Sequence, residues 1–374
     1  MLLSDICEII MGQSPSSDSY NVKGQGLPFF QGNADFGKLY PSVRLWCNCP
    51  IKKAEAGDLL VSVRAPIGAV NLANQKCCIG RGLAALRPYR DKCDAMYLYY
   101  LIKAGKNKLN WLGTGSTFKA ITRSSLLSFN VPDYCIALQR KISGKLWSVD
   151  KLIHQRNEQL KLFDLLIQSR FLEMFGDIQH NPCKWDIEPL SAVCHKITDG
   201  EHGSVQRVSE GYVYLNAKNI RQDGNIDWEN ITHISFKDHA KIFKRCNPEP
   251  DDILLTTTGT VGNIAIVPKV GPFSIDRGIT LLKINNDRLN NIYLANLLNS
   301  EYLQQCMKNN IHASAIGHLF LKQVKSLSVM LPPLHLQNQF ADYVVHIDKS
   351  KMAVQKSLDE LETLKKSLMQ TYFG

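Results

Sequence analysis

The chain repeats one plan twice, and this internal repeat constrains the fold more than any other feature. Phe373-Gly374 at the end matches Phe175-Gly176 in the middle, 198 residues earlier. Three further matches share that offset: Val149-Asp150-Lys151 with Ile347-Asp348-Lys349, Ser169 with Ser367, and Gln139 with Gln337. Upstream the offset falls by a few residues, as insertions in surface loops would cause. Two copies of one unit therefore make up the sequence.

Each copy ends in a stretch whose apolar residues recur at steps of four and three, the pattern of a heptad seam. The seam positions are Ile142, Leu146, Val149, Ile153, Leu160, Phe163 and Ile167 in the first stretch, and Phe340, Val344, Ile347, Val354, Leu358, Leu361, Leu368 and Tyr372 in the second. Arg156, Lys351 and Lys365 are the polar exceptions. Two matched amphipathic helices can bury their seams on each other, and we expect an antiparallel coiled coil. The alternative is that each helix packs on its own domain.

The segments between these helices have short β-rich runs separated by turn signals. Strands are predicted over 58–63, 212–216, 253–258, 263–267 and 278–284, and single helices over 94–104 and 291–307. The predicted fold is α+β, with two globular domains of mixed α/β structure joined and followed by long helices. The predicted boundaries are 1–134 and 177–333 for the domains, and 135–176 and 334–374 for the helical segments.

The composition favours a protein with polyanionic partners. Lys and Arg number 44 against 34 Asp and Glu, so the formal net charge is +10, which makes nucleic acid a leading candidate. No apolar run is long enough to cross a membrane, and the first residues lack the pattern of a secretory signal. We therefore expect a cytoplasmic protein with no membrane partner. The 11 cysteines include no CxxC pair, and no metal site is expected.

The motifs of nucleic-acid enzymes do not occur in the sequence. It has no NPPY- or DPPF-like tetrapeptide, no GxGxxG after a strand and no GxxxxGK[ST] phosphate loop. None of the 34 acidic residues stands two positions before a lysine, a spacing that metal-dependent nucleases often use. We therefore expect no catalytic residue in this chain.

Several motifs together resemble the target-recognition domain of the specificity subunit of type I restriction-modification systems. In the first half they are FFQGNADFG (29–37), GDLLVSVRAPIGAV (57–70), CIGRGL (78–83) and GSTFKAI (115–121). The second half departs more, with TTTGTVGNI (256–264), SIDRGI (274–279) and HASAIGHLF (312–320). The doubled layout covers the whole chain. The difference between the halves is expected if they read different DNA sequences.

The resemblance implies a subunit that reads double-stranded DNA and does no chemistry. Each domain would contact one half of an asymmetric bipartite site, while the helices would form a spacer that docks two methyltransferase subunits, through which restriction subunits join. No cofactor is implied for this chain, and S-adenosylmethionine, ATP and Mg are expected on the partner subunits. The seam from 142 to 170 would span about 42 Å at ~1.5 Å per residue, slightly more than the ~34–36 Å of one DNA turn.

Candidate DNA contacts come from long polar side chains and from hydroxyl or basic groups on loops. Turns beside a predicted strand carry Gln31, Asn33 and Lys38 in the first half, and Asn216, Lys218, Asn219 and Arg221 in the second. These residues meet base edges or, alternatively, form a turn network. Arg64, Arg81 and Arg277 clamp phosphate or brace the fold. A Gly- and hydroxyl-rich loop supplies Thr114, Ser116, Thr117 and Lys119, mirrored by Ser314 and His318, with Thr258 in the TTTGTVG turn.

Two other functions remain open from the sequence alone. The chain could be the recognition part of an enzyme whose methyltransferase or nuclease portion lies on a longer reading frame. It could also be a helical adaptor that binds only proteins, in which case DNA binding would be absent even with partners present.

Overall fold

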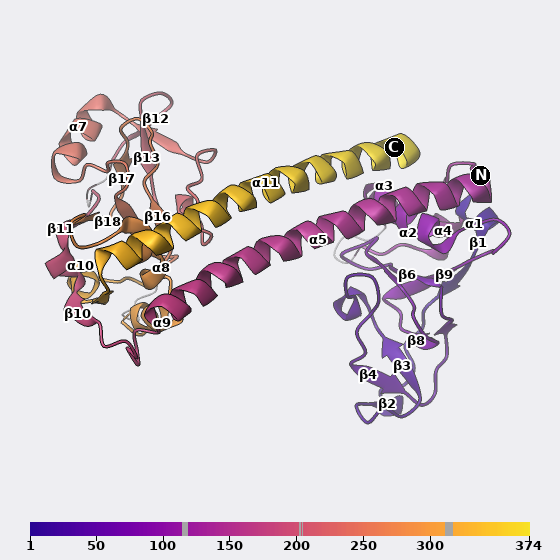
Figure 1. The fold of residues 1–374 in the computed structure, drawn as a ribbon. Coiled ribbons are helices and arrows are strands. Elements are labelled where there is room, and N and C mark those ends of the chain that lie inside the picture. Colours follow the sequence, from indigo (N-terminus) through magenta and orange to yellow (C-terminus); the bar gives the residue numbers. More distant parts are fainter. Residues whose placement is uncertain (114–118, 202, 204, 311–316) are drawn as a thin grey trace. The chain divides into compact units, whose positions relative to one another are not determined.

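The computed structural model describes residues 1–113, 119–201, 203, 205–310 and 317–374. They form two compact units (Figure 1). Unit 1 comprises Met1–Glu158 together with Gln355–Gly374, and unit 2 comprises Gln159–Val354. Each unit thus contains part of each long helix, and each is described by itself below.

Unit 1 contains two sheets. The first is antiparallel and has the order β1 (Cys7–Met11), β9 (Leu83–Pro88), β6 (Leu59–Ser62) and β7 (Val70–Leu72). The second has the order β2 (Tyr20–Asn21), β4 (Leu45–Cys47), β3 (Leu27–Phe30), β8 (Cys77–Ile79) and β5 (Lys53–Ala54), with β3 and β8 parallel. Strand β6 is buried along its whole length, with three apolar residues followed by Ser62, whose hydroxyl donates to Arg64 O at 2.8 Å.

Four short helices complete the globular part of unit 1: α1 (Leu3–Ile6), α2 (Ala95–Ala104), α3 (Lys106–Leu112) and α4 (Arg123–Leu127). Helix α2 begins where the Asp94 carboxylate accepts the Tyr97 N–H at 2.9 Å, an ordinary N-cap. Tyr97, Leu98 and Leu101 of this helix pack into the core beside the first sheet. The predicted helix over 94–104 is confirmed.

Unit 2 repeats the strand order of unit 1, except that its second sheet has no counterpart of β5 among the described residues. Its first sheet has the order β11 (Cys194–Asp199), β18 (Ile279–Ile284), β15 (Ile253–Thr256) and β16 (Ile264–Ile266), and its second has β12 (Arg207–Val208), β14 (Thr232–Ile234), β13 (Tyr212–Leu215) and β17 (Ser274–Ile275). Strands β13 and β17 are parallel, like β3 and β8 of unit 1. A further pair joins β10 (Asp186–Pro189) to β19 (Ser328–Leu331).

The helices of unit 2 correct one sequence prediction. They are α6 (Leu190–Val193), α7 (Phe236–Arg245), α8 (Asn291–Leu298), α9 (Glu301–Asn309) and α10 (Leu321–Lys325). The single helix predicted over 291–307 is wrong, because α8 ends before Asn299 and α9 starts after Ser300. Ser300 adopts an extended conformation and its hydroxyl caps α9, so this residue type interrupts a continuous apolar pattern.

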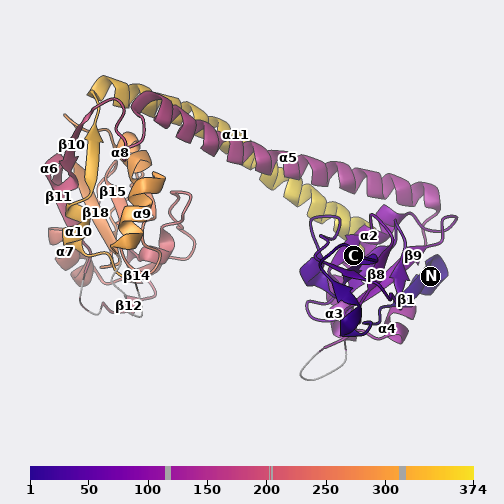
Figure 2. The ribbon, with the colours of Figure 1, turned by 90° about the horizontal axis from the view of Figure 1, so that it is seen from below.

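The long helices are α5 (Ile136–Phe175) and α11 (Leu334–Phe373) (Figure 2). In unit 1, Ile142 and Leu146 of α5 share a core with Phe373 of α11. In unit 2, Phe340 of α11 packs edge-on against Phe171 and Phe175 of α5. The last residues of α11 therefore lie beside the first residues of α5, and the first beside the last, which is the predicted antiparallel pairing.

The long helices pack in both of the ways that the sequence allowed, against each other and against the globular domains. All the predicted seam positions are buried or half-buried, and the ends of each helix also pack into the core of a globular unit. Two of the three polar exceptions form ion pairs with the opposite helix: Lys365 Nζ lies 2.5 Å from Asp150 in unit 1, and Lys351 Nζ lies 2.7 Å from Asp164 in unit 2. Such pairs favour one register of a helix pair. Among the described residues, no helix has the length and apolar character needed to span a membrane.

Candidate nucleic-acid interface

In unit 1, the loops that follow β3 and β8 of the second sheet and β6 of the first sheet meet. Gln31 directly follows β3, and its loop lies against the Gly80–Gly82 turn that follows β8. The Gly80 N–H donates to Phe30 O at 2.8 Å, and the Val63 N–H donates to Gly82 O at 3.0 Å. A Cβ on Gly82 would lie 2.3 Å from Gln31 O, so the close approach of the two backbones requires glycine there.

A fourth segment reaches the same loops. Arg64 forms an isolated bridge with Ala120, and the Ile121 N–H donates to Val63 O at 2.8 Å. Lys119 precedes this contact and is exposed, like the other candidates here. We call Gln31, Arg64, Arg81 and Lys119 the strand-end surface of unit 1. The fold therefore brings together side chains that lie far apart in the sequence, three of them cationic.

Unit 2 builds the same arrangement with different residues. The Asp276 N–H donates to Leu215 O at 3.0 Å, and the Thr257 N–H donates to Gly278 O at 2.8 Å. Thr258 bridges to His318, and its hydroxyl lies 2.7 Å from His318 Nδ1. We call Lys218, Thr258, Arg277 and His318 the strand-end surface of unit 2. A shared backbone frame thus carries two chemically different sets of side chains.

A cleft of about 400 Å³ opens beside Arg277. It is lined by Glu201, Gly203, Val205, Arg207, Tyr214, Asp276 and Arg277. The Arg207 guanidinium lies over the Tyr214 ring, 4.2 Å from its centroid. Burial raises the pKa of Asp276, although its carboxylate accepts the Gly278 N–H at 2.8 Å. The cleft therefore offers both cationic donors and carboxylate acceptors within a small volume.

Four predicted contacts lie elsewhere or are engaged within the fold. Lys38 is exposed, and its Nζ lies 3.3 Å from His154 Nδ1 on α5. Asn219 is 3% exposed, and its amide donates to the carbonyls of Asp227 and Asn230. Asn216 caps the turn by accepting the Lys218 N–H, and Arg221 pairs with Asp227 at 3.2 Å. The placements of Asn216, Asn219 and Arg221 match the turn-network alternative, and the burial of Asn219 argues against a DNA contact by that side chain.

The remaining predicted residues have simpler outcomes. Asn33 is half-buried at the start of a short 3-10 helix, Asn33–Asp35. Thr114, Ser116, Thr117 and Ser314 lie outside the described residues. Two residues that are prominent in the structure were not singled out from the sequence: Arg207, which lines the cleft beside Arg277, and Trp111, which is 89% exposed at the end of α3. An aromatic residue in a lysine-rich segment followed by glycine was the signal that could have identified Trp111.

The described residues were also searched for side chains that could bind a metal ion, and the cysteines were considered with them. In the part of the chain that the structure describes, no three or more His, Cys, Asp or Glu side chains gather so as to hold a metal ion. Burial raises the pKa of the adjacent thiols Cys77 and Cys78 to about 12. Their thiol forms therefore pack as apolar groups in the second sheet of unit 1.

Comparison with known proteins places this architecture in a family. A protein described as the type I restriction enzyme MjaX specificity subunit of Methanocaldococcus jannaschii is 44% identical over 152 residues, which cover 41% of this chain and 36% of that relative. The MjaIX specificity subunit of the same organism is 21% identical over 98% of this chain and 90% of its own length. The crystal structure of a type I restriction-modification S subunit from M. genitalium is 18% identical, covers 100% of this chain and 95% of that one, and has a TM-score of 0.62.

The crystal structure shows that the fold is shared, and the family follows from the sequence itself. The model of the type I restriction modification DNA specificity domain matches residues 1–162 and again residues 198–363. The two matched segments correspond to the repeated strand order of units 1 and 2. The chain therefore belongs to the family of type I restriction-modification DNA specificity domains, and it carries two matches to that domain.

Proposed function

We propose that this chain is the sequence-specific DNA-binding subunit of a type I restriction-modification complex, in which each unit reads one half of an asymmetric bipartite site. The observation that carries the proposal is the repeated strand-end surface. One hydrogen-bonded frame presents Gln31, Arg64, Arg81 and Lys119 in unit 1, and Lys218, Thr258, Arg277 and His318 in unit 2. Two recognition units that read different half-sites require different side chains on the same backbone arrangement, and the two units have this property.

The chemistry of these groups divides their proposed tasks. Lysine and arginine neutralise phosphates, which supplies affinity without sequence preference. The Gln31 amide can pair with an adenine edge, and an arginine can pair with guanine. In unit 2, the carboxylates of Glu201 and Asp276 beside Arg277 can accept hydrogen bonds from the amino groups of cytosine or adenine. Two linked recognition units also raise each other's effective concentration on a site with the correct spacing.

We further propose that the long helices bind the catalytic partners. Several apolar side chains of α5 and α11 are exposed: Trp147, Leu152, Leu162, Leu165, Leu166, Leu172, Met352 and Leu364. Exposed apolar surface of this kind is typical of protein interfaces. Two methyltransferase subunits would dock there and restriction subunits would join through them. S-adenosylmethionine, ATP and Mg would act on those subunits, in the cytoplasm, and this chain would be non-catalytic.

The experiment that tests the function is methylation sequencing in a host that lacks DNA methylation. The partner genes are expressed with this chain, without it, or with an Arg81→Ala/Arg277→Ala double variant. We expect N6-methyladenine at one split, asymmetric motif only when the wild-type chain is present, and weaker modification with the double variant.

The other outcomes identify the competing functions. Equal methylation with and without this chain would overturn the proposal. Co-purification with the partners combined with no salt-dependent DNA binding would indicate a helical adaptor. Methylation by the purified chain in the absence of any partner would indicate that the chain is itself an enzyme.

A further inference from the structure

We propose that Trp111 is a DNA wedge: its indole ring stacks against the bases of the half-site that unit 1 binds and partly unstacks one base step. This inference rests on the proposed function and assigns a specific task to one side chain. Trp111 is 89% exposed, more than any other large apolar side chain in the described part of the molecule. Apolar side chains inserted between bases are a known way for proteins to kink a duplex.

The backbone that carries Trp111 is held firmly. Helix α3 buries Leu109 completely in the core of unit 1. At its two ends, α3 lies against the turn that carries Arg64: a Cβ on Gly68 would lie 3.3 Å from Lys106 Cα, and a Cβ on Gly113 would lie 2.9 Å from Ile67 Cδ1. An aromatic ring has only two torsions to restrict, so ordering it on a fixed helix costs little entropy.

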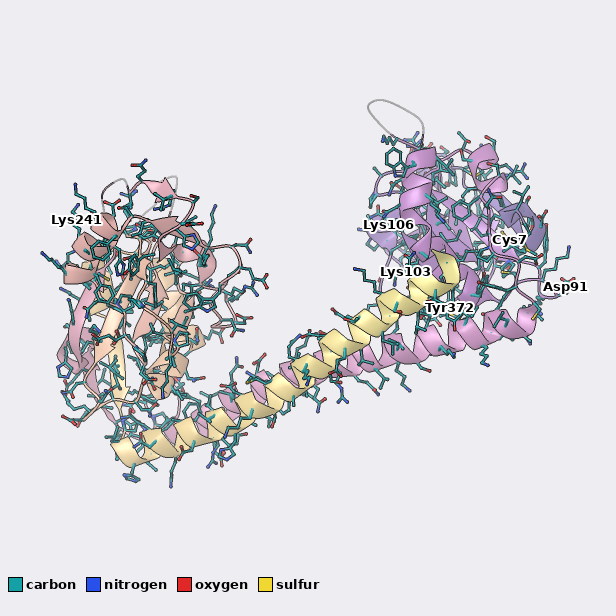
Figure 3. The ribbon with its side chains drawn as sticks, turned by 90° about the horizontal axis from the view of Figure 1, so that it is seen from above. Cys7, Asp91, Lys103, Lys106, Lys241 and Tyr372 are labelled. Carbon is teal, nitrogen blue, oxygen red and sulfur yellow. The ribbon has the colours of Figure 1, made fainter. Side chains whose placement is uncertain are left out.

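The electrostatic setting of Trp111 suits a polyanion. Lys108 lies one helical turn before it, and a Cβ on Gly113 would be 3.6 Å from Lys119 Cβ. Figure 3 shows Lys103 and Lys106 on the same side of unit 1 as Tyr372, near the end of α11. Between Asp94 and Asp133 the sequence has no acidic residue, and it has the cations Lys103, Lys106, Lys108, Lys119 and Arg123. A protein surface that docks here would need strong negative charge, whereas DNA supplies it throughout.

The wedge is specific to unit 1. Ile121 and Leu319 occupy equivalent positions in the two units. The Ile121 N–H donates to the carbonyl of Val63, which follows β6, at 2.8 Å, and the Leu319 N–H donates to the carbonyl of Thr257, which follows β15, at 2.9 Å. At the same offset of 198 residues, Trp111 corresponds to Asn309, an exposed amide that accepts a hydrogen bond from Gln305 at 2.7 Å. The two half-sites are therefore bound differently: one with an aromatic wedge and one without.

The test uses the complex assembled with its methyltransferase partners and a duplex that contains its own methylated motif. We expect Trp111→Ala to weaken binding about tenfold or more, since stacking on an aromatic ring makes a contribution of that order. The slope of affinity against salt stays unchanged, because no phosphate contact is lost. Lys119→Ala should instead reduce that slope by about one. Trp111→Phe should keep most of the affinity.

A fluorescent base analogue reports the wedge directly. With 2-aminopurine placed in each half-site in turn, we expect brighter emission on binding in one half-site only, and no increase with Trp111→Ala. Tyr89→Ala is the matched control, since it removes a 41% exposed aromatic ring of the same unit that lies outside the proposed DNA and methyltransferase surfaces, and it should leave DNA affinity unchanged. Thermal unfolding of each variant verifies that the fold is intact.

The results separate the wedge from the function on which it rests. If the wild-type complex does not distinguish its motif from other DNA, the proposed function fails. If the wild type is selective and Trp111→Ala binds equally well, the wedge is wrong. Loss of methyltransferase co-purification with Trp111→Ala would also overturn it, by making Trp111 a protein contact.

Discussion

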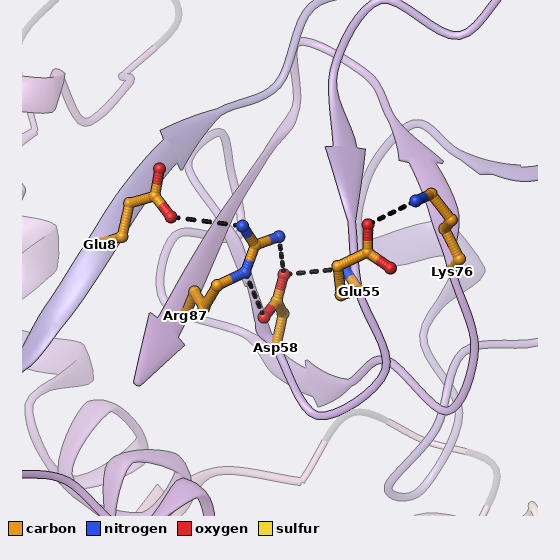
Figure 4. Close-up of polar contacts among 5 residues, drawn as sticks. All are labelled: Glu8, Glu55, Asp58, Lys76 and Arg87. Carbon is orange, nitrogen blue, oxygen red and sulfur yellow. Dashed lines mark hydrogen bonds and ion pairs between the residues drawn. The ribbon is translucent and has the colours of Figure 1, made fainter. Parts of the chain in front are cut away.

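The Arg87 guanidinium donates two hydrogen bonds to the Asp58 carboxylate, from Nε at 3.1 Å and from Nη2 at 2.9 Å (Figure 4). Glu8 lies 3.2 Å from Nη1, and Asp58 also accepts the Glu55 N–H. In unit 2, Lys283 takes the same place, 2.7 Å from Asp252 and 2.9 Å from Glu249. In each unit, therefore, a cation on β9 or β18 pairs with the Asp residue that directly precedes the neighbouring strand, β6 or β15.

Removing the cation should destabilise unit 1, because the Asp58 side chain is 3% exposed and would lose its charged partner. We expect Arg87→Ala to lower the free energy of unfolding by about 1–3 kcal/mol, a reduced value since the Arg87 side chain is itself 36% exposed. Arg87→Lys, which copies the arrangement of unit 2, should cost less. Urea unfolding measures both changes, and equal stability of Arg87→Ala and wild type would contradict the prediction.

A buried glutamine anchors the start of each long helix. Gln139 accepts the Asp94 N–H at 3.0 Å and donates to the carbonyls of Lys92 and Tyr134. Gln337 makes the same three kinds of bond, with Asn290, Arg288 and Pro332.

Truncating either glutamine leaves several backbone groups without partners. We expect Gln139→Ala and Gln337→Ala each to cost about 2–3 kcal/mol of unfolding free energy. Gln155→Ala, at an exposed position of α5, serves as the control and should change stability little. A cost at Gln155 equal to that at Gln139 would refute a specific anchoring role.

Asp150 links α5 both to α11 and to the globular part of unit 1. It pairs with Lys365 at 2.5 Å and accepts the Tyr100 hydroxyl at 2.9 Å. Asp150→Asn keeps an acceptor for Tyr100 and removes the ion pair, so we expect a loss of about 0.5–1 kcal/mol, as for a partly exposed pair. Asp150→Ala removes both contacts and should cost about 1–3 kcal/mol. Equal thermal shifts for the two variants would show that the ion pair contributes all of the effect.

The sequence predicted those features of the fold that recur in both halves of the chain. Offsets of 198 residues located both long helices and the two anchoring glutamines, because packing against a common frame preserves spacing. The break between α8 and α9 was not predicted, since a serine cap inside an apolar run leaves the helical period intact. The ion-pair partners of Lys351 and Lys365 could not be predicted either. A heptad pattern shows on which face of its own helix a residue lies, but it does not show which residue of the other helix lies opposite.

The candidate interface was predictable in part. Arg64, Arg81, Lys119, Thr258, Arg277 and His318 lie at strand ends, as the motifs placed them in turns. The sequence left two alternatives for Asn219, because a polar side chain in a turn has the same pattern whether it faces solvent or satisfies backbone carbonyls. Trp111 was missed because its 89% exposure is a property of the folded chain, and an aromatic residue on a short helix is usually buried.

Arg81 and Arg277 should each contribute one phosphate contact if the strand-end surfaces bind DNA. We expect Arg81→Ala and Arg277→Ala each to weaken binding of the assembled complex and to reduce the slope of log affinity against log salt by about one. Arg90→Ala is a matched control, at an exposed position in the turn before α2. Fluorescence anisotropy at several salt concentrations gives the slopes, and unchanged slopes for both variants would exclude these arginines as phosphate contacts.

The turn that holds Arg221 should respond to acid through Asp227. The Asn230 side-chain amide at 2.9 Å, the Arg221 guanidinium at 3.2 Å and the backbone N–H groups of Glu229 and Asn230 lower the pKa of Asp227 from 3.8 to about 2. A carboxyl group whose pKa is lower in the folded chain stabilises it above the unfolded value, and this contribution is lost as the pH falls from about 4 to about 2. Hydrogen exchange of residues 221–230 should therefore accelerate in that window relative to other turns. Asp227→Asn should remove this pH dependence, and a wild-type turn that exchanges equally fast, after correction for intrinsic rates, at pH 5 and pH 2 would show that Asp227 does not hold it.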